Sequence, residues 1–351
     1  MRCLLLWALV LPLALFAAEY PPVRPGVPVN LPADHGAHPD YRTEWWYVTG
    51  WLTDEQGRER GFQITFFRVR SGLGEPSKGR FSPAQLIFAH AAIADPARGR
   101  LRHAQRSARA SGRLAGSAIG GLDVWLEGWS LRARDSGYRA LARGEDFALD
   151  LTLAPTRDPL LQGDAGFSQK GPTEAHASYY YSLPALAVSG AIELDGASLA
   201  VSGEAWLDHE WSSALMPEGA VGWDWTGINL SDGGALMAFR MRDAEGGVMW
   251  SSGTLRDSDG GRRILTPQDL ALAPGRRWTS PRTGTAYPVE WTLRLGARTL
   301  TLAPLMDDQE LDARGSTGAV YWEGAVRVLE QGAVVGRGYL EMTGYAGRLE
   351  L

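Results

Sequence analysis

Apolar residues in this sequence recur in short runs that glycine, aspartate and serine separate. The runs have the length of β-strands, and pairs such as Asp195-Gly196 and Asp232-Gly233 favour tight turns between them. Helical periodicity is scarce, and we expect a helical or loop excursion only over residues 104–121. The pattern predicts an all-β protein in which antiparallel strands close into barrels or sandwiches. The predicted strands cover residues 45–52, 61–69, 147–153, 187–194, 198–206, 222–230, 235–241 and 321–329.

A degenerate internal repeat divides the chain. The run WYVTG at residues 46–50 matches WDWTG at residues 223–227, and AWLD at 205–208 matches GYLE at 338–341. Two related all-β units are the simplest explanation, with an N-terminal unit over residues 38–211 and a C-terminal unit over 212–351. Chance similarity is the alternative, because Gly and Trp recur in any fold rich in hairpins.

Several longer runs carry a resemblance to a known family. They are HPDYRTEWWYVTGWL (38–52), HASYYYSLPAL (176–186), GEAWLDHEWS (203–212), GWDWTGINL (222–230) and the tail from residue 321 to 345. These runs resemble the AttH-like and carotenoid 1,2-hydratase-like (CrtC-type) proteins. The resemblance implies two tandem lipocalin-like antiparallel β-barrels packed side by side, often exported and sometimes encoded beside an ABC transporter. The family includes hydratases of acyclic carotenoids and cyclases of polyenes, so membership alone does not fix an activity.

One run matches a motif that the resemblance links to catalysis. In the hydratase branch, the His and the second aromatic residue of an Asp-His-x-Trp run are implicated, and Asp208, His209, Glu210 and Trp211 match that run. The same branch uses a Tyr-x-Asp on a later strand. Here that strand, residues 236–240, reads LMAFR and carries neither residue. This departure argues against carotenoid hydration in particular.

The N-terminus and the composition set further limits. Residues 1–18 combine Arg2, an apolar run and small residues, which predicts a signal peptide and export to the periplasm or beyond. A Pro-rich linker follows over residues 19–37. The single cysteine, Cys3, would leave with the signal peptide, so disulfides and Cys nucleophiles are excluded. The net charge of −5 provides no basic face for nucleic acid.

The chemistry of the Asp208–Trp211 run follows from strand geometry. Alternate side chains share a face, so Asp208 and Glu210 point one way, and His209 and Trp211 point the other way. An acid in an indole-lined interior would be held neutral and could protonate an alkene, while Trp faces stabilise the resulting cation. In the alternative interpretation the run only closes a barrel, and its acids cap turns or pair with arginine.

Aromatic strands supply candidates for ligand binding. Glu44 and Trp46 share one strand face, and Trp45 and Tyr47 share the other. We expect an apolar pocket with these ligand-binding residues: Glu44, Trp46, Tyr180, Trp223, Asp224 and Trp225. The alternative for Trp46 is a structural plug of the barrel, accompanied by an arginine such as Arg68. The 14 tryptophans exceed what core packing alone usually recruits.

Other chemistries find little support in the sequence. The six histidines show no metal-ligand spacing, and no nucleophile elbow or phosphate-binding loop occurs, so we predict neither a metal nor a cofactor. We therefore predict a protein that binds a hydrophobic small molecule, a lipid or isoprenoid, with an ABC transporter as the expected partner. Two alternatives stay open: a hydratase or cyclase acting at Asp208–Trp211, and a carbohydrate-active protein. The sequence does not set the oligomeric state.

Overall fold

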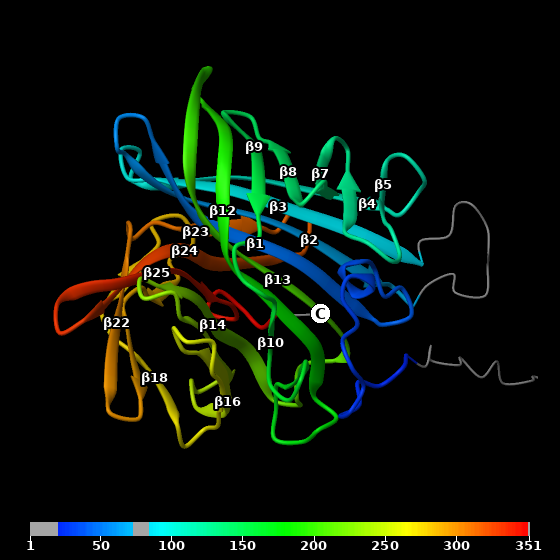
Figure 1. Ribbon diagram of the computed structural model, residues 1–351, viewed down its shortest axis with the longest axis vertical. Helices are drawn as coiled ribbons and strands as arrows, with labels where there is room; N and C mark the ends of the chain where they lie inside the picture. Colours follow the sequence, from blue (N-terminus) through cyan, green and yellow to red (C-terminus); the bar gives the residue numbers. More distant parts are fainter. Residues whose placement is uncertain (1–19, 73–83, 350–351) are drawn as a thin grey trace, which may run out of the picture.

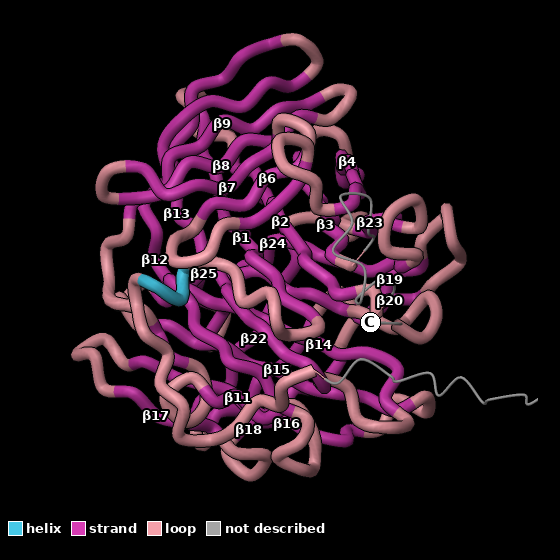
Figure 2. Tube along the Cα trace, turned by 90° about the vertical axis from the view of Figure 1, so that its right-hand side faces the viewer, coloured by secondary structure: helices cyan, strands magenta, loops and turns pink. Residues whose placement is uncertain are grey.

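The computed structural model describes residues 20–72 and 84–349, so the predicted signal peptide lies outside the described residues. Two large antiparallel sheets form two bodies, one above the other in Figures 1 and 2. The predicted all-β fold of two lipocalin-like barrels is confirmed. A short 3-10 helix, η1 (Ala33–His35), precedes the first strand. Within the described residues, no helix is long and apolar enough to cross a bilayer.

The first sheet is a nearly closed barrel. Its order is β4-β3-β2-β1-β13-β12-β9-β8-β7-β6-β5, with β10 and β11 also paired to β12. The strands are β1 (Thr43–Asp54), β2 (Glu59–Arg70), β3 (Gln85–Asp95), β4 (Arg100–Arg109), β5 (Ala115–Ser117), β6 (Asp123–Leu126), β7 (Trp129–Arg134), β8 (Gly137–Arg143), β9 (Phe147–Ala154), β10 (Leu160–Leu161), β11 (Phe167–Gln169), β12 (Ala177–Leu194) and β13 (Ala197–Ala214).

The second sheet has the order β17-β16-β15-β14-β25-β24-β22-β21-β18, with β23 paired to β24 and a separate pair, β19-β20, beside it. The strands are β14 (Ala220–Leu230), β15 (Ala235–Asp243), β16 (Val248–Arg256), β17 (Arg262–Leu265), β18 (Leu270–Pro274), β19 (Arg277–Thr279), β20 (Ala286–Pro288), β21 (Trp291–Leu295), β22 (Arg298–Pro304), β23 (Glu310–Ala313), β24 (Ala319–Glu330) and β25 (Ala333–Met342).

The change of sheet falls between β13 and β14, a few residues after the predicted boundary at 211/212, which lies within β13. The two-domain division itself stays a prediction. The expected excursion over residues 104–121 is wrong in its first part, because β4 runs to Arg109 and pairs along its whole length with β3. Backbone hydrogen bonds to the long strand β3 hold this stretch as a strand, although its small and charged residues favour strands only weakly.

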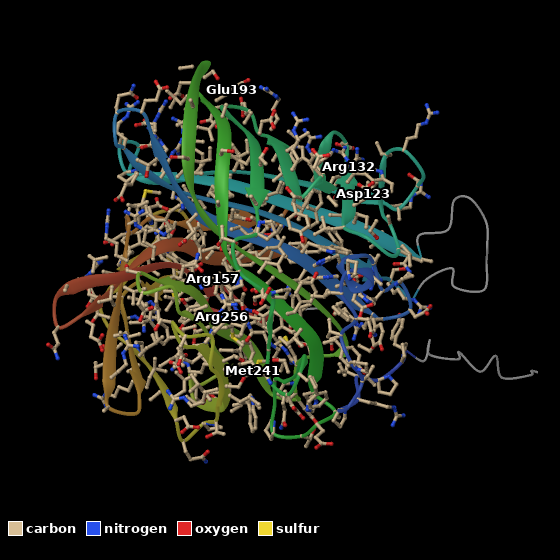
Figure 3. The ribbon with its side chains drawn as sticks, in the orientation of Figure 1. Asp123, Arg132, Arg157, Glu193, Met241 and Arg256 are labelled. Carbon is tan, nitrogen blue, oxygen red and sulfur yellow. The ribbon has the colours of Figure 1, made fainter. Side chains whose placement is uncertain are left out.

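The two bodies meet through β1, β2, β12 and β13 of the first barrel and β14, β24 and β25 of the second. The strands β1 and β2 contact β25 and β24, and an apolar cluster that includes Tyr47, Trp225 and Met241 lies between the sheets. The indole of Trp51 donates a hydrogen bond of 3.1 Å across this seam to the carbonyl of Gly338. The outer face of the first barrel carries exposed ion pairs instead, such as Arg132–Asp123, far from the seam (Figure 3).

Strand register refines the internal repeat. Tyr47 pairs with Asp208 in the first barrel, and Trp225 pairs with Glu341 in the second. Tyr47 is therefore equivalent to Trp225, one residue away from the alignment that the sequence suggests. The shift follows from side-chain alternation, because Tyr47 and Trp225 both face the seam. Asp208 and Glu341 keep the equivalence that the sequence repeat gave them.

Candidate functional site

A cavity of about 250 Å³ lies at the seam between the barrels. Strands β1, β2 and β3 of the first barrel and β14, β15, β24 and β25 of the second border it. Its walls are largely aromatic, which suits an apolar ligand. The aromatic residues are Trp45, Tyr47, Phe67, Phe88, Trp223, Trp225, Phe239 and Tyr321.

Asp208 reaches this cavity from β13. Its carboxyl is buried and accepts hydrogen bonds from Tyr180 (2.7 Å), Ser182 (2.5 Å) and the indole of Trp206 (2.6 Å). Burial raises the pKa of Asp208 to about 7, although these donors oppose the rise. The phenol of Tyr180 also accepts a hydrogen bond of 3.0 Å from Trp225, which ties the acid to the second barrel. Asp208 can therefore give or take a proton near neutral pH.

Glu210 faces the same cavity but has an ionic partner. The ammonium of Lys170 lies 3.0 Å from Glu210 Oε1, and the hydroxyl of Ser178 donates to the same oxygen. Lys170 also lies over the rings of Tyr180 (4.4 Å) and Phe239 (4.7 Å). A buried carboxylate held in this way is best suited to orient its neighbours and to fix the local charge.

The second barrel contributes two further carboxyl groups. Glu323 on β24 and Glu341 on β25 stand directly opposite each other, and both line the cavity. The indole of Trp223 donates to Glu341 at 2.6 Å. Burial raises the pKa of Glu341 to about 7, and the charges of Asp208 and Glu210 add to the rise. Burial also raises the pKa of Glu323 well above its usual range.

Sequence reasoning missed three charged residues of this site as well as several of its aromatic walls. The charged residues are Glu323, Glu341 and Lys170, and none of them belongs to a motif that the sequence marks as a site. Glu323 and Glu341 do fall within the tail, residues 321–345, that carries the family resemblance. The signal for Glu341 was present in the repeat, which aligns it with Asp208. The position of Lys170 beside Glu210 depends on tertiary structure alone.

The other face of β13 points into the first barrel. His209 and Trp211 lie in its core, as does Trp46, which stacks on the His209 ring at 4.8 Å between centroids. The predicted alternation along the Asp208–Trp211 run is therefore seen in the structure, but it separates His209 and Trp211 from the cavity. The structure places Trp46 where the plug interpretation expects it.

Glu44 borders the cavity, yet its carboxyl is held on the core side. It contacts His209 Nε2 (2.9 Å), His38 Nδ1 (2.7 Å) and Arg68 Nε (2.8 Å). Burial acts to raise the pKa of Glu44, but the two histidines and Arg68 hold it well below its usual value. Burial lowers the pKa of His209, so its imidazole is neutral at pH 7. We interpret this set as a structural network of the barrel.

His38, Glu44 and His209 also form a group whose ligand atoms lie within 4.8 Å of one another. No spacing pattern could reveal it, because the three residues come from separate segments. Such a set is chemically able to hold a metal ion. The buried guanidinium of Arg68 already neutralises the Glu44 carboxylate and would repel a metal cation. His38 Nδ1 and His209 Nε2 already hydrogen-bond to Glu44 Oε1. The arrangement fits a hydrogen-bonded network better than a metal site.

Asp224 lies in the core side of the second barrel. Its carboxylate pairs with Arg240 (2.6 Å) and Arg242 (2.9 Å), and Tyr345 donates to it at 2.9 Å. Asp224 therefore does not face the junction, unlike the indoles of Trp223 and Trp225 on either side of it. Side-chain alternation along β14 explains the difference.

The structure thus sorts the predicted site residues into two groups. Around the cavity it brings together Asp208, Glu210, Tyr180, Trp223 and Trp225. The other group points into the barrel cores and consists of His209, Trp211, Trp46, Asp224 and the carboxyl of Glu44.

These features define a class: a protein of two lipocalin-like barrels with an aromatic, acidic cavity at their seam. The AttH-like family model matches residues 22–345, and the chain belongs to that family. Among curated proteins, no sequence matches the chain.

Solved structures share the fold. An AttH protein from Nitrosomonas europaea is 48% identical, with a TM-score of 0.86, over 93% of this chain and 99% of that one. Kievitone hydratase from Nectria haematococca is 16% identical, with a TM-score of 0.69, over 94% and 97%. The structure of CghA with Sch210972 is 13% identical, with a TM-score of 0.53, over 87% and 90%. The last two show the fold alone.

Proposed function

We propose that the protein is an enzyme that protonates a carbon–carbon double bond of an apolar small molecule in the seam cavity, as a hydratase does. One observation carries the proposal: Asp208 and Glu341 occupy equivalent positions in the two barrels and border the same aromatic cavity, each with a pKa of about 7. Near neutral pH, one of the two carboxyls can donate a proton while the other accepts one.

The proton balance of a hydration fits this pair. The protonated carboxyl transfers its proton to one alkene carbon, and the oxygen of a water molecule bonds to the other carbon. The proton that this water loses passes to the second, ionised carboxylate. The alkene becomes an alcohol, and the pair exchanges roles for the next turnover. If an internal double bond captures the cation instead of water, the product is a ring, which covers the cyclase alternative.

The cavity wall supports a cationic intermediate. The indoles of Trp223 and Trp225 line the cavity beside Glu341, and an aromatic face attracts positive charge by up to about 2 kcal/mol when water is excluded. Kievitone hydratase, a protein of the same fold, is by its name a hydratase, which agrees with this class of reaction without identifying a substrate here.

The second candidate is the binding protein that the sequence favoured. The aromatic walls support it, because they suit a lipid or isoprenoid. The carboxyl groups argue against it, because burying carboxyls beside a purely apolar ligand is unfavourable without a chemical role. Export, an ABC transporter partner and carbohydrate binding remain proposals that rest on the sequence and on the family.

The decisive experiment follows incorporation of labelled water. The purified protein is incubated at pH 7 in H₂¹⁸O with the acyclic terpenoids myrcene, geraniol and farnesol, and products are analysed by mass spectrometry. We expect a labelled alcohol with the wild-type protein. Asp208→Asn and Glu341→Gln should each lower the rate by roughly 10²–10⁴.

Glu310→Gln is the matched control, because Glu310 is a buried carboxylate that Ser280 holds at 2.7 Å outside the cavity. It should keep the wild-type rate. If neither a labelled alcohol nor a cyclised isomer forms, the enzymatic proposal is wrong. Recovery of an apolar ligand by native mass spectrometry would then support the binding protein.

A further inference from the structure

Glu323 differs from every other carboxyl of the cavity in its contacts. Its side chain is 1% exposed and lines the cavity. Among the residues that the structure describes, none forms a hydrogen bond of ordinary geometry with either carboxyl oxygen, although the phenols of Tyr47 and Tyr321 lie near enough to influence its pKa. Native proteins rarely leave such a group unpaired unless a ligand or a water molecule completes it. Glu323 is therefore aimed at an occupant of the cavity that carries a polar group.

The first barrel provides a second group of this kind. The phenol of Tyr47 is buried, lines the same cavity and also forms no hydrogen bond of ordinary geometry with the described residues. Tyr47 and Glu323 influence each other's pKa values, so the two groups lie close together across the seam. The phenol has a hydrogen atom to donate.

A relay fixes the direction of hydrogen bonding at a third group, Tyr321. The hydroxyl of Ser316 donates to a backbone carbonyl, so it accepts from His90 Nε2 at 2.9 Å. His90 Nδ1 is then an acceptor, and the phenol of Tyr321 donates to it at 2.6 Å. Burial lowers the pKa of His90 to about 3, in agreement with a neutral ring. The oxygen of Tyr321 consequently offers only acceptor capacity to the cavity.

The charge at this end of the cavity is also constrained. Glu323 stands opposite Glu341, and two carboxylates in that position repel each other. Burial raises the pKa of Glu323 well above its usual range, and the neighbouring Glu341 adds to the rise. Burial and the neighbouring Glu341 both favour the protonated form of Glu323, which can donate one hydrogen bond and accept another.

We propose that Glu323, Tyr47 and Tyr321 form a subsite for a hydroxyl group of the ligand, either an alcohol or a phenol. The subsite offers hydrogen-bond donors and acceptors together, which is the complement of a neutral hydroxyl. The ligand of this cavity is then an oxygenated apolar molecule and not a pure hydrocarbon. The inference builds on the proposed function by naming the substrate class of the same cavity.

A matched pair of probes tests this subsite. Binding of 2-naphthol and of naphthalene is measured by equilibrium dialysis at pH 7, where 2-naphthol is uncharged. We expect the wild-type protein to bind 2-naphthol about tenfold more tightly, the effect of one or two net hydrogen bonds. Glu323→Leu should abolish this preference, and Glu323→Gln, whose amide donates and accepts, should retain part of it. Glu310→Gln should leave the preference unchanged.

Two results would overturn the inference: equal affinity of the wild-type protein for both probes, including no binding of either, or a preference that survives in Glu323→Leu. The dialysis involves no turnover, so its outcome is independent of the labelled-water experiment. A retained hydroxyl preference without any labelled or cyclised product would reject the enzymatic proposal and leave the subsite intact. Labelled product without a hydroxyl preference would support the enzymatic proposal and reject the hydroxyl subsite.

Discussion

Two buried glutamates, Glu44 and Glu323, show how the same residue type serves different ends in this molecule. Glu44 lies between β13 and β2 with Arg68 and two histidines around its carboxylate, and its pKa is lowered. Glu323 lies at the seam without an ordinary hydrogen bond from the described residues, and its pKa is raised. The comparison teaches that a carboxylate inside a barrel is neutralised by the barrel itself, whereas the Glu323 carboxyl at the seam keeps hydrogen-bonding capacity for a ligand.

Asp224 extends the comparison to the second barrel. Like Glu44, it points into a barrel core, and Arg240 and Arg242 neutralise it. Asp208 and Glu341 resemble Glu323 instead, because both border the seam cavity and both have a pKa raised to about 7. The direction of the pKa shift therefore separates Glu44 in the barrel core from Asp208 and Glu341 at the cavity.

The largest effect on stability should come from breaking the core pair. Glu44→Gln leaves the guanidinium of Arg68 buried without its counter-charge, so we expect a loss of roughly 3–5 kcal/mol in the free energy of unfolding. Urea denaturation followed by circular dichroism measures this loss. Glu193→Gln is the control, since it removes only an exposed pair with Arg143 at the far tip of the first barrel (Figure 3), and should leave the free energy of unfolding close to that of the wild-type protein. Equal small effects would contradict a structural role for Glu44.

A second, intermediate effect concerns pH. The pKa of Glu341 is about 7 in the folded protein and 4.5 in the unfolded chain. Because the folded protein holds this proton more tightly, protonation of Glu341 at low pH favours folding. Stability from this group is present at low pH and is lost as the pH rises from about 4.5 to 7, by at most about 1.4 kcal/mol per pH unit. Glu44 has the opposite sign, because its lowered pKa gives stability above its ordinary pKa that is lost in acid.

Glu341→Gln should therefore flatten the decline in stability between pH 5 and pH 7. Urea unfolding of the wild-type protein and the variant at both pH values measures the difference. An unchanged slope would mean that Glu341 ionises as freely in the folded chain as in the unfolded one.

The smallest effect should come from Glu323. Replacing a buried, unpaired acid by an apolar side chain of similar size removes a desolvation penalty, so Glu323→Leu should raise the free energy of unfolding by roughly 1 kcal/mol. Thermal and urea denaturation of the ligand-free protein measure the change. A loss of several kcal/mol would show that Glu323 has a structural partner after all, and the contrast with Glu44 would fail.

The sequence predicted much of the fold because strands and turns leave local signals. Alternation along β13 correctly divided Asp208 and Glu210 from His209 and Trp211, and the repeat correctly aligned Asp208 with Glu341. The sequence did not show which of the two faces borders a cavity. Both faces of β1 and of residues 205–212 in β13 are buried, one against the barrel core and one against the second barrel, so hydrophobic patterning carries no information about the difference.

By itself, therefore, the sequence determined an all-β chain of two related halves, the family and the pairing of faces along each strand. Tertiary structure decided which acids meet. Arg68 reaches Glu44 only because β1 and β2 are paired. Glu323 and Glu341 border the same cavity as Asp208 because β24 and β25 pack against β2 and β1 of the first barrel. Ionisation of a carboxyl depends on the charges and the water around it, and those are set by residues that are distant along the chain.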